Sequence, residues 1–223
     1  MIVYWTLFGI GALAMTAYIV LRCRQAGIGY IRTIMFTFVC LIGGFLAGKL
    51  MAALSNWDSV MEAGFFSVGQ SIMGPVFCDI LLVPVAGHLF GLKKEFVHDL
   101  CGPSLAILIA FQRIGCFFEG CCGGILATIG SMSFRWPAQI MESIGDFLIF
   151  GILLDYEKTG RYKGRLYPMF LFYYGCLRFL VEFVRIPEKR ILFLSHWQWW
   201  AIAAVCVGYF WNNSVKEKNY ENN

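Results

Sequence analysis

LYPMFLFYYGCLRFLVEFVR, residues 166–185, is the stretch of sequence that decides the fold class. Its first 19 residues form one apolar segment, and a helix of about 20 mostly apolar residues crosses a lipid bilayer. Six other segments along the chain have the same character. The predicted spans are 1–21, 33–54, 68–92, 100–118, 137–154, 166–184 and 197–211.

The composition agrees with a membrane protein. Of the 223 residues, 59% are hydrophobic and 14% are charged, whereas a soluble domain has about 25% charged residues. These values exclude a disordered chain, a coiled coil and an ordinary soluble enzyme. We therefore predict an all-α integral membrane protein, with one transmembrane domain over residues 1–211 and a polar cytoplasmic tail over residues 212–223. The net charge of +4 is not gathered in one patch, so no nucleic-acid partner is expected.

The basic residues predict the orientation. The connections after the first, third and fifth spans, together with the tail, hold 11 of the 18 lysines and arginines. Cytoplasmic loops carry such an excess, which puts the N-terminus outside and the C-terminus in the cytoplasm. Seven spans satisfy this arrangement, and the first is expected to be a retained helix because it lacks a basic start and a clear cleavage site.

Ionisable residues inside predicted spans mark a candidate site, because they are expensive in lipid. Tyr174, Arg178, Glu182 and Arg185 are spaced four, four and three apart, which places them on one helix face. Further polar residues fall toward the outer ends of other spans: Gln70, Ser71, Arg113, Gln139, Glu142 and Asp146. The excess of arginine predicts a cavity for an anionic lipid head group. The alternative is that Arg178–Glu182 and Arg113–Glu142 are ion pairs that only hold helices together.

Three of the nine cysteines are close in sequence, at Cys116, Cys121 and Cys122. They are compatible with a disulfide, a metal site or a nucleophile, and the glycines around them also suit a purely structural turn. No C-x-x-C zinc spacing is present, so neither a metal nor another cofactor is predicted.

Three segments resemble motifs of the prolipoprotein diacylglyceryl transferase family. QRIGCFFEGCCGG, residues 112–124, is similar to the signature GRxGNFxNGExxG and closer still to the variant GRxGCFxxGCCYG. RWPAQIME, residues 135–142, resembles RHPxQLYE, and YGCLRFLVEFVR, residues 174–185, resembles YGxxRFxxExxR. The order, the spacing and the seven-span topology agree, and the resemblance covers roughly residues 71–208.

The resemblance implies an enzyme of the bacterial cytoplasmic membrane that works at its outer face. Members of the family move a diacylglyceryl group from phosphatidylglycerol to the lipobox cysteine thiol of a prolipoprotein and release glycerol phosphate. The implied partners are phosphatidylglycerol, a prolipoprotein signal peptide with its lipobox Cys, and membrane lipids. The acceptor supplies the nucleophilic thiol, so the enzyme needs none of its own.

The resemblance also implies roles for individual residues. Arg113 and Arg178 would hold the phosphate and stabilise the leaving group, and Glu182 would orient the arginines. Tyr174 would donate a hydrogen bond or shuttle a proton. The substrate-binding positions that it implies are Arg185, Glu142, Gln139, Cys116, Glu119 and Ser71.

The chain departs from the family pattern at several positions. Met73 stands where the family has the His often regarded as the base, and Trp136 replaces another His. Cys116, Glu119 and Cys121 replace two Asn and a Glu of the signature. Proton removal would then fall to Glu119, Glu142, Tyr174 or water. Two alternatives stay open: a transferase of the same fold with another lipid or acceptor, and a non-catalytic protein that binds lipid or uses its thiols in redox chemistry.

Overall fold

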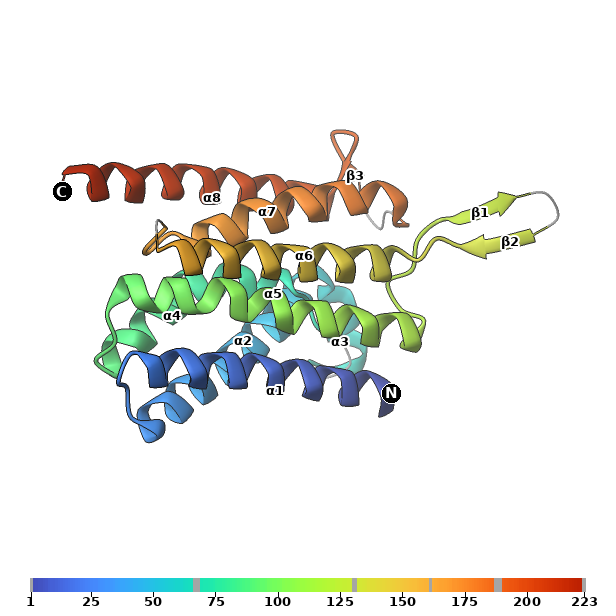
Figure 1. Ribbon diagram of the computed structural model, residues 1–223. Helices are drawn as coiled ribbons and strands as arrows, with labels where there is room; N and C mark the ends of the chain where they lie inside the picture. Colours follow the sequence, from blue (N-terminus) through green and yellow to red (C-terminus); the bar gives the residue numbers. More distant parts are fainter. Residues whose placement is uncertain (1, 66–68, 130–131, 161, 187–189, 222–223) are drawn as a thin grey trace. The chain divides into compact units, whose positions relative to one another are not determined.

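The computed structural model describes residues 2–65, 69–129, 132–160, 162–186 and 190–221. Helices make up most of this part of the chain (Figure 1). They are α1 (Ile2–Gln25), α2 (Tyr30–Ser55), α3 (Trp57–Ala63), α4 (Met73–Leu89), α5 (Lys94–Glu119), α6 (Ala138–Thr159), α7 (Leu166–Val181), the 3₁₀ turn η1 (Glu182–Val184) and α8 (His196–Glu221). Two antiparallel hairpins pair β1 (Leu126–Ile129) with β2 (Met132–Arg135) and β3 (Arg190–Ile191) with β4 (Leu194–Ser195).

The predicted all-α fold class is confirmed, and each of the seven predicted segments overlaps one helix of 16 or more residues. The number of membrane spans and their orientation stay predictions. The short helix α3 and both hairpins were not predicted. The third segment differs most, because α4 begins at Met73 rather than at residue 68. Pro75 lies in the first turn of α4, where a proline costs no helical hydrogen bond. The helix α8 continues to Glu221, beyond the predicted end of the last span at Trp211.

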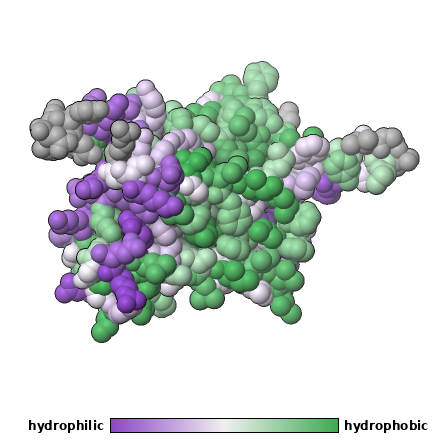
Figure 2. Space-filling model, in the orientation of Figure 1, coloured by the Kyte–Doolittle hydropathy of each residue, from purple (hydrophilic) through white to green (hydrophobic). Residues whose placement is uncertain are grey.

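The helices are apolar on the outside as well as inside. Among the described residues, α1, α2 and α5 are long and apolar enough to cross a membrane, and α4 is a shorter apolar helix. Large hydrophobic side chains such as Leu13 and Leu81 are more than 70% exposed, and hydrophobic residues cover most of the surface visible in Figure 2. An apolar surface of this extent suits contact with lipid, so the chain is a multi-pass membrane protein.

The chain divides into two compact units, residues 19–98 and the rest. We call residues 19–98 the α2–α4 unit. Its helices α2 and α4 pack closely, because glycines without side chains stand where their backbones meet. A Cβ on Gly74 would collide with the backbone of Ala47, and one on Gly48 would lie 2.9 Å from the carbonyl of Ser71. The Ser71 amide donates to the carbonyl of Gly48, at 3.2 Å.

The other unit, which we call the α5–α8 unit, holds most of the predicted site. Its helices α6, α7 and α8 run side by side (Figure 1). Gly175 and Gly208 let α7 and α8 approach, because a Cβ on Gly175 would lie 2.8 Å from the carbonyl of Ala201; small residues serve this purpose in membrane helices. The start of α7 is fixed by Asp99 of α5, whose carboxylate accepts the amides of Gly164 and Leu166 at 2.7 and 3.1 Å.

Both hairpins also belong to the α5–α8 unit. The β1–β2 hairpin projects from the connection between α5 and α6 (Figure 1). The turn between β3 and β4 places Leu192 and Phe193 in the left-handed region, with φ of 49° and 70°, where residues other than glycine are uncommon. The side chain of Phe193 is 96% exposed, so this hairpin presents an apolar tip.

Candidate functional site

The polar stripe predicted on residues 174–185 is buried. Tyr174 and Arg178 lie on α7, Glu182 opens the turn η1, and Arg185 follows it. The first three are at most 4% exposed, and the side chain of Arg185 is 11% exposed. The regular helix ends at Val181, but the tighter turn keeps Glu182 and Arg185 on the same side as Arg178. The stripe thus faces the interior of the α5–α8 unit.

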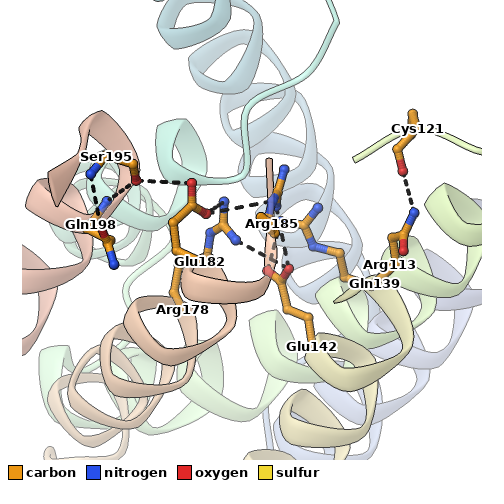
Figure 3. Close-up of polar contacts among 9 residues, drawn as sticks. All are labelled: Arg113, Cys121, Gln139, Glu142, Arg178, Glu182, Arg185, Ser195 and Gln198. Atoms are coloured by element: carbon orange, nitrogen blue, oxygen red, sulfur yellow. Dashed lines mark hydrogen bonds and ion pairs between the residues drawn. The ribbon is translucent and has the colours of Figure 1, made fainter. Parts of the chain in front are cut away.

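Glu142 of α6 is the centre of an ion-pair cluster that joins three helical segments (Figure 3). Its Oε1 lies 2.8 Å from Nη2 of Arg113, which α5 supplies. Its Oε2 lies 3.6 Å from Nη1 of Arg178 and 3.8 Å from Nη1 of Arg185. Glu182 is the second anion, 3.0 Å from Arg178 and 3.6 Å from Arg185. We call Arg113, Glu142, Arg178, Glu182 and Arg185 the arginine cluster.

The arginine cluster has one positive charge in excess, because three guanidinium groups face two carboxylates. Buried charges are costly unless they are fully paired. Some hydrogen-bonding atoms at the site have no hydrogen-bond partner among the described residues. They are Arg113 Nε, Arg178 Nη1, the hydroxyl of Tyr174, and carboxylate oxygens of Glu142, Glu182 and the neighbouring buried Asp146. Burial and the neighbouring cations Arg178 and Arg113 lower the pKa of Arg185. The cluster is therefore suited to receive an anion with several acceptor oxygens.

A second layer of contacts holds Glu182 in place. The hydroxyl of Ser195 donates to Glu182 Oε1, at 3.0 Å. Ser195 and Gln198 also bond to each other twice at the start of α8, since Gln198 N donates to Ser195 Oγ and Ser195 N donates to Gln198 Oε1. This arrangement is a capping box. Sequence reasoning missed both residues, although the pattern Ser-x-x-Gln before an apolar segment is a known signal for a helix start.

The three neighbouring cysteines converge at one edge of this site. The sulfur atoms of Cys116, Cys121 and Cys122 all lie within 4.8 Å of one another, and we call these residues the thiol cluster. Cys116 is buried near the end of α5, and the other two are exposed in the loop that follows. The pKa of Cys122 lies well below its usual range, because the other two thiols hydrogen-bond to its sulfur and Arg113 and Arg185 favour the thiolate.

The remaining predicted residues occupy different positions. Gln139 lies one turn before Glu142 and donates to the carbonyl of Cys121, at 2.6 Å (Figure 3). Glu119 is exposed at the end of α5. Ser71 is half-buried in the α2–α4 unit, where its amide is held by α2. Seven of the ten predicted site residues are thus gathered in or beside the arginine cluster, Cys116 is in the thiol cluster, and Glu119 and Ser71 lie elsewhere. The roles of all ten stay predictions.

Comparison with known proteins gives a consistent result. The family model described as prolipoprotein diacylglyceryl transferase matches residues 2–212. A phosphatidylglycerol–prolipoprotein diacylglyceryl transferase of Clostridium tetani is 28% identical over 93% of this chain and 90% of its own length. The second such protein of Clostridium perfringens is 29% identical over 96% and 91%. One from Polynucleobacter asymbioticus is 30% identical over 78% and 68%.

Proposed function

This chain belongs to the prolipoprotein diacylglyceryl transferase family, and on that premise we propose that it transfers the diacylglyceryl group of phosphatidylglycerol to the lipobox cysteine of a prolipoprotein. The observation that carries the proposal is the buried arginine cluster with its single excess positive charge. The phosphodiester of phosphatidylglycerol carries one negative charge, which balances that excess. The chain is thus a transferase of lipoprotein biosynthesis.

The reaction exchanges one bond for another. The sulfur of the acceptor cysteine forms a bond to the terminal glyceryl carbon of the donor, and the bond between that carbon and the phosphate oxygen breaks. The electron pair leaves on that oxygen, glycerol phosphate departs, and the thiol proton passes to a base. Negative charge therefore grows on the phosphate during the reaction.

The arginines supply stabilisation where this charge develops. Arg113 and Arg178 bind the phosphate oxygens, and their guanidinium groups are already held in place by Glu142 and Glu182. A pre-oriented cation needs no reorganisation during the reaction. Arg185 adds a third cation at the more exposed edge, and Tyr174 supplies a buried hydroxyl that has no partner among the described residues.

The membrane setting follows from the same proposal. Seven predicted spans, with 11 of 18 basic residues on alternate connections, favour an N-terminus outside and a C-terminus in the cytoplasm. This orientation puts the arginine cluster toward the outer leaflet of the bacterial cytoplasmic membrane. Phosphatidylglycerol and the signal peptide of a translocated prolipoprotein would both reach it there.

A reconstituted transfer assay tests the function. The protein is placed in phosphatidylglycerol vesicles with a lipobox peptide that contains one cysteine, and the peptide mass and the released glycerol phosphate are followed. We expect a diacylglyceryl adduct that Arg178→Ala abolishes. The control is Arg165→Ala, just before α7, whose guanidinium donates to Asn212 and lies over the ring of Tyr162 rather than beside the arginine cluster. An adduct that persists in Arg178→Ala would contradict the assigned role of the cluster.

A further inference from the structure

In the described part of the chain, the thiol cluster is the one place beside the arginine cluster where several cysteine sulfurs, which are soft metal ligands, lie together. Its three sulfurs approach within 4.8 Å of one another. The zinc–sulfur bond is about 2.3 Å long, so three thiolates around one tetrahedral ion lie about 3.8 Å apart. Small rotations of the side chains are enough to bring the three sulfurs to one ion.

The backbone is shaped to bring two adjacent cysteines to the same point. Side chains of consecutive residues in an extended segment point to opposite sides. Here Gly120 and Cys122 both have left-handed backbones, with φ of 72° and 59°, and the turn they make aims Cys121 and Cys122 toward Cys116. A left-handed conformation is unfavourable for cysteine, and such strain gathers at functional sites.

The loop of the thiol cluster is tied directly to the arginine cluster. The carbonyl of Cys121 accepts from Gln139, one turn before Glu142. Gly124 pairs with Arg185 in an isolated bridge, and the amide of Ile125 donates to the carbonyl of Val184 at 2.9 Å. The thiols therefore lie next to the place where the phosphate and its cleaved bond are proposed to sit.

Three protein ligands and one open position are the pattern of a catalytic zinc site, whereas a structural site is closed by four. A thiol that coordinates zinc loses its proton. Three thiolates and one Zn²⁺ carry a net charge of −1, and the cations Arg113 and Arg185 near Cys122 stabilise a negative complex.

We propose that Cys116, Cys121 and Cys122 bind a Zn²⁺ ion whose fourth position takes the thiol of the acceptor peptide. This inference rests on the proposed function. The acceptor thiol replaces a zinc-bound hydroxide, and its proton leaves with that hydroxide as water. The bound sulfur then forms the bond to the glyceryl carbon while the carbon–oxygen bond to phosphate breaks. The thioether product is a weak zinc ligand, so water displaces it. That water gives a proton to the departing glycerol phosphate, which restores the zinc-bound hydroxide, and the ion stays Zn²⁺ throughout.

Covalent catalysis by one of these cysteines does not fit the same chemistry. An enzyme thiol that attacked the glyceryl carbon would form a thioether with the lipid. A thioether is a poor leaving group, so the lipid could not pass on to the acceptor. A direct attack by an enzyme thiol on the glyceryl carbon would therefore inactivate the enzyme. The thiols are suited instead to hold and activate the acceptor sulfur through a metal ion.

Cobalt binding tests the metal site without any need for activity. Full-length protein is purified in detergent under reducing conditions, stripped with a chelator and titrated with Co²⁺ alone. We expect one Co²⁺ per chain with thiolate-to-cobalt charge-transfer absorption, which both Cys121→Ser and Cys122→Ser remove. The control is Cys206→Ser, an exposed cysteine of α8, which should keep the absorption. The proposal is overturned if the protein binds no stoichiometric Co²⁺. It is also overturned if the protein does not retain metal and its thiol cluster contains a disulfide.

The open position is tested with two peptides. A lipobox peptide with cysteine should shift the cobalt spectrum, and X-ray absorption of the zinc form should change from three sulfur ligands to four, while the serine peptide changes neither. Removal of the metal should lower the initial transfer rate of the wild-type protein at least tenfold, and Zn²⁺ should restore it. An unchanged spectrum with the cysteine peptide, or full activity without metal, overturns the assigned role. Normal spectra without any transfer would instead support the site and contradict the proposed function.

Discussion

Replacement of Ser195 by alanine separates a positioning contact from an ordinary helix cap. The Ser195 hydroxyl accepts from Gln198 N and donates to Glu182 Oε1 at 3.0 Å. Loss of an N-cap costs about 1 kcal/mol, and loss of a hydrogen bond to a charged group costs about 1.5–3 kcal/mol. We therefore expect Ser195→Ala to lower the free energy of unfolding by about 2.5–4 kcal/mol.

The matched variant is Gln198→Ala, which breaks the same capping box but leaves the bond to Glu182. It should lower the free energy of unfolding by about 0.5–1.5 kcal/mol. The two variants should differ in activity, because only Ser195→Ala frees the carboxylate that orients Arg178 and Arg185. A loss of about 1.4 kcal/mol in transition-state stabilisation gives a tenfold lower kcat/KM, which we expect for Ser195→Ala alone.

The assay combines thermal unfolding in detergent with initial rates of transfer to the lipobox peptide. Ser195→Thr keeps a hydroxyl and should recover most of the rate. The reasoning is refuted if Ser195→Ala and Gln198→Ala lower kcat/KM equally, because the effect would then come from the helix start and not from Glu182. It is also refuted if neither variant changes the rate.

Three further perturbations test the site and its packing. Glu142→Gln removes the anion shared by three arginines and should lower the free energy of unfolding by about 3–5 kcal/mol. Thermal unfolding measures this change, and the transfer activity should be lost with it. Stability within about 1 kcal/mol of the wild type would contradict the ion pairs. Gly175→Ala puts a Cβ 2.8 Å from the carbonyl of Ala201 and should destabilise by about 1–3 kcal/mol, while the control Gly151→Ala, which meets nothing within 4 Å, should stabilise by about 0.5–1 kcal/mol. Because the pKa of Cys122 is lowered, the rate of its alkylation in metal-free protein should stay high as the pH falls from about 8 to 6. The alkylation rate of an ordinary thiol falls about tenfold per pH unit over this range. Peptide mapping that shows this ordinary pH dependence would contradict the thiolate.

The sequence predicts those parts of the fold and site that depend on local periodicity. Apolar segments marked the seven helices of 16 or more residues, and the spacing of Tyr174, Arg178, Glu182 and Arg185 placed them on one buried face. Arg113 and Glu142 were marked as ionisable residues within other predicted spans, but no periodicity within one helix connects them. Their contact depends on how α5 and α6 pack, and that is decided by many side chains at once.

The contacts that sequence reasoning missed join elements far apart in the chain. Asp99 caps the start of α7 across 65 and 67 residues, and Ser195 reaches Glu182 from the other end of a hairpin. The hairpins were missed because their strands are two to four residues long, too short for an alternating pattern to be distinct.

Two departures from the family signature, Cys116 and Cys121, lie together in the structure. Arg113, Glu142, Arg178 and Glu182 keep the resemblance and form the part of the site that we propose to bind phosphate. Cys116 and Cys121 depart from it, and both belong to the thiol cluster. A change of one residue to cysteine needs no functional explanation. Three sulfurs that converge on a left-handed turn are different, because both the residue types and the backbone conformation then favour the same site. The arginine cluster, which we propose to bind the phospholipid donor, thus follows the family. The thiol cluster, which we propose to bind the acceptor thiol, is where the chemistry of this chain should differ, and metal binding by the thiol cluster would show it.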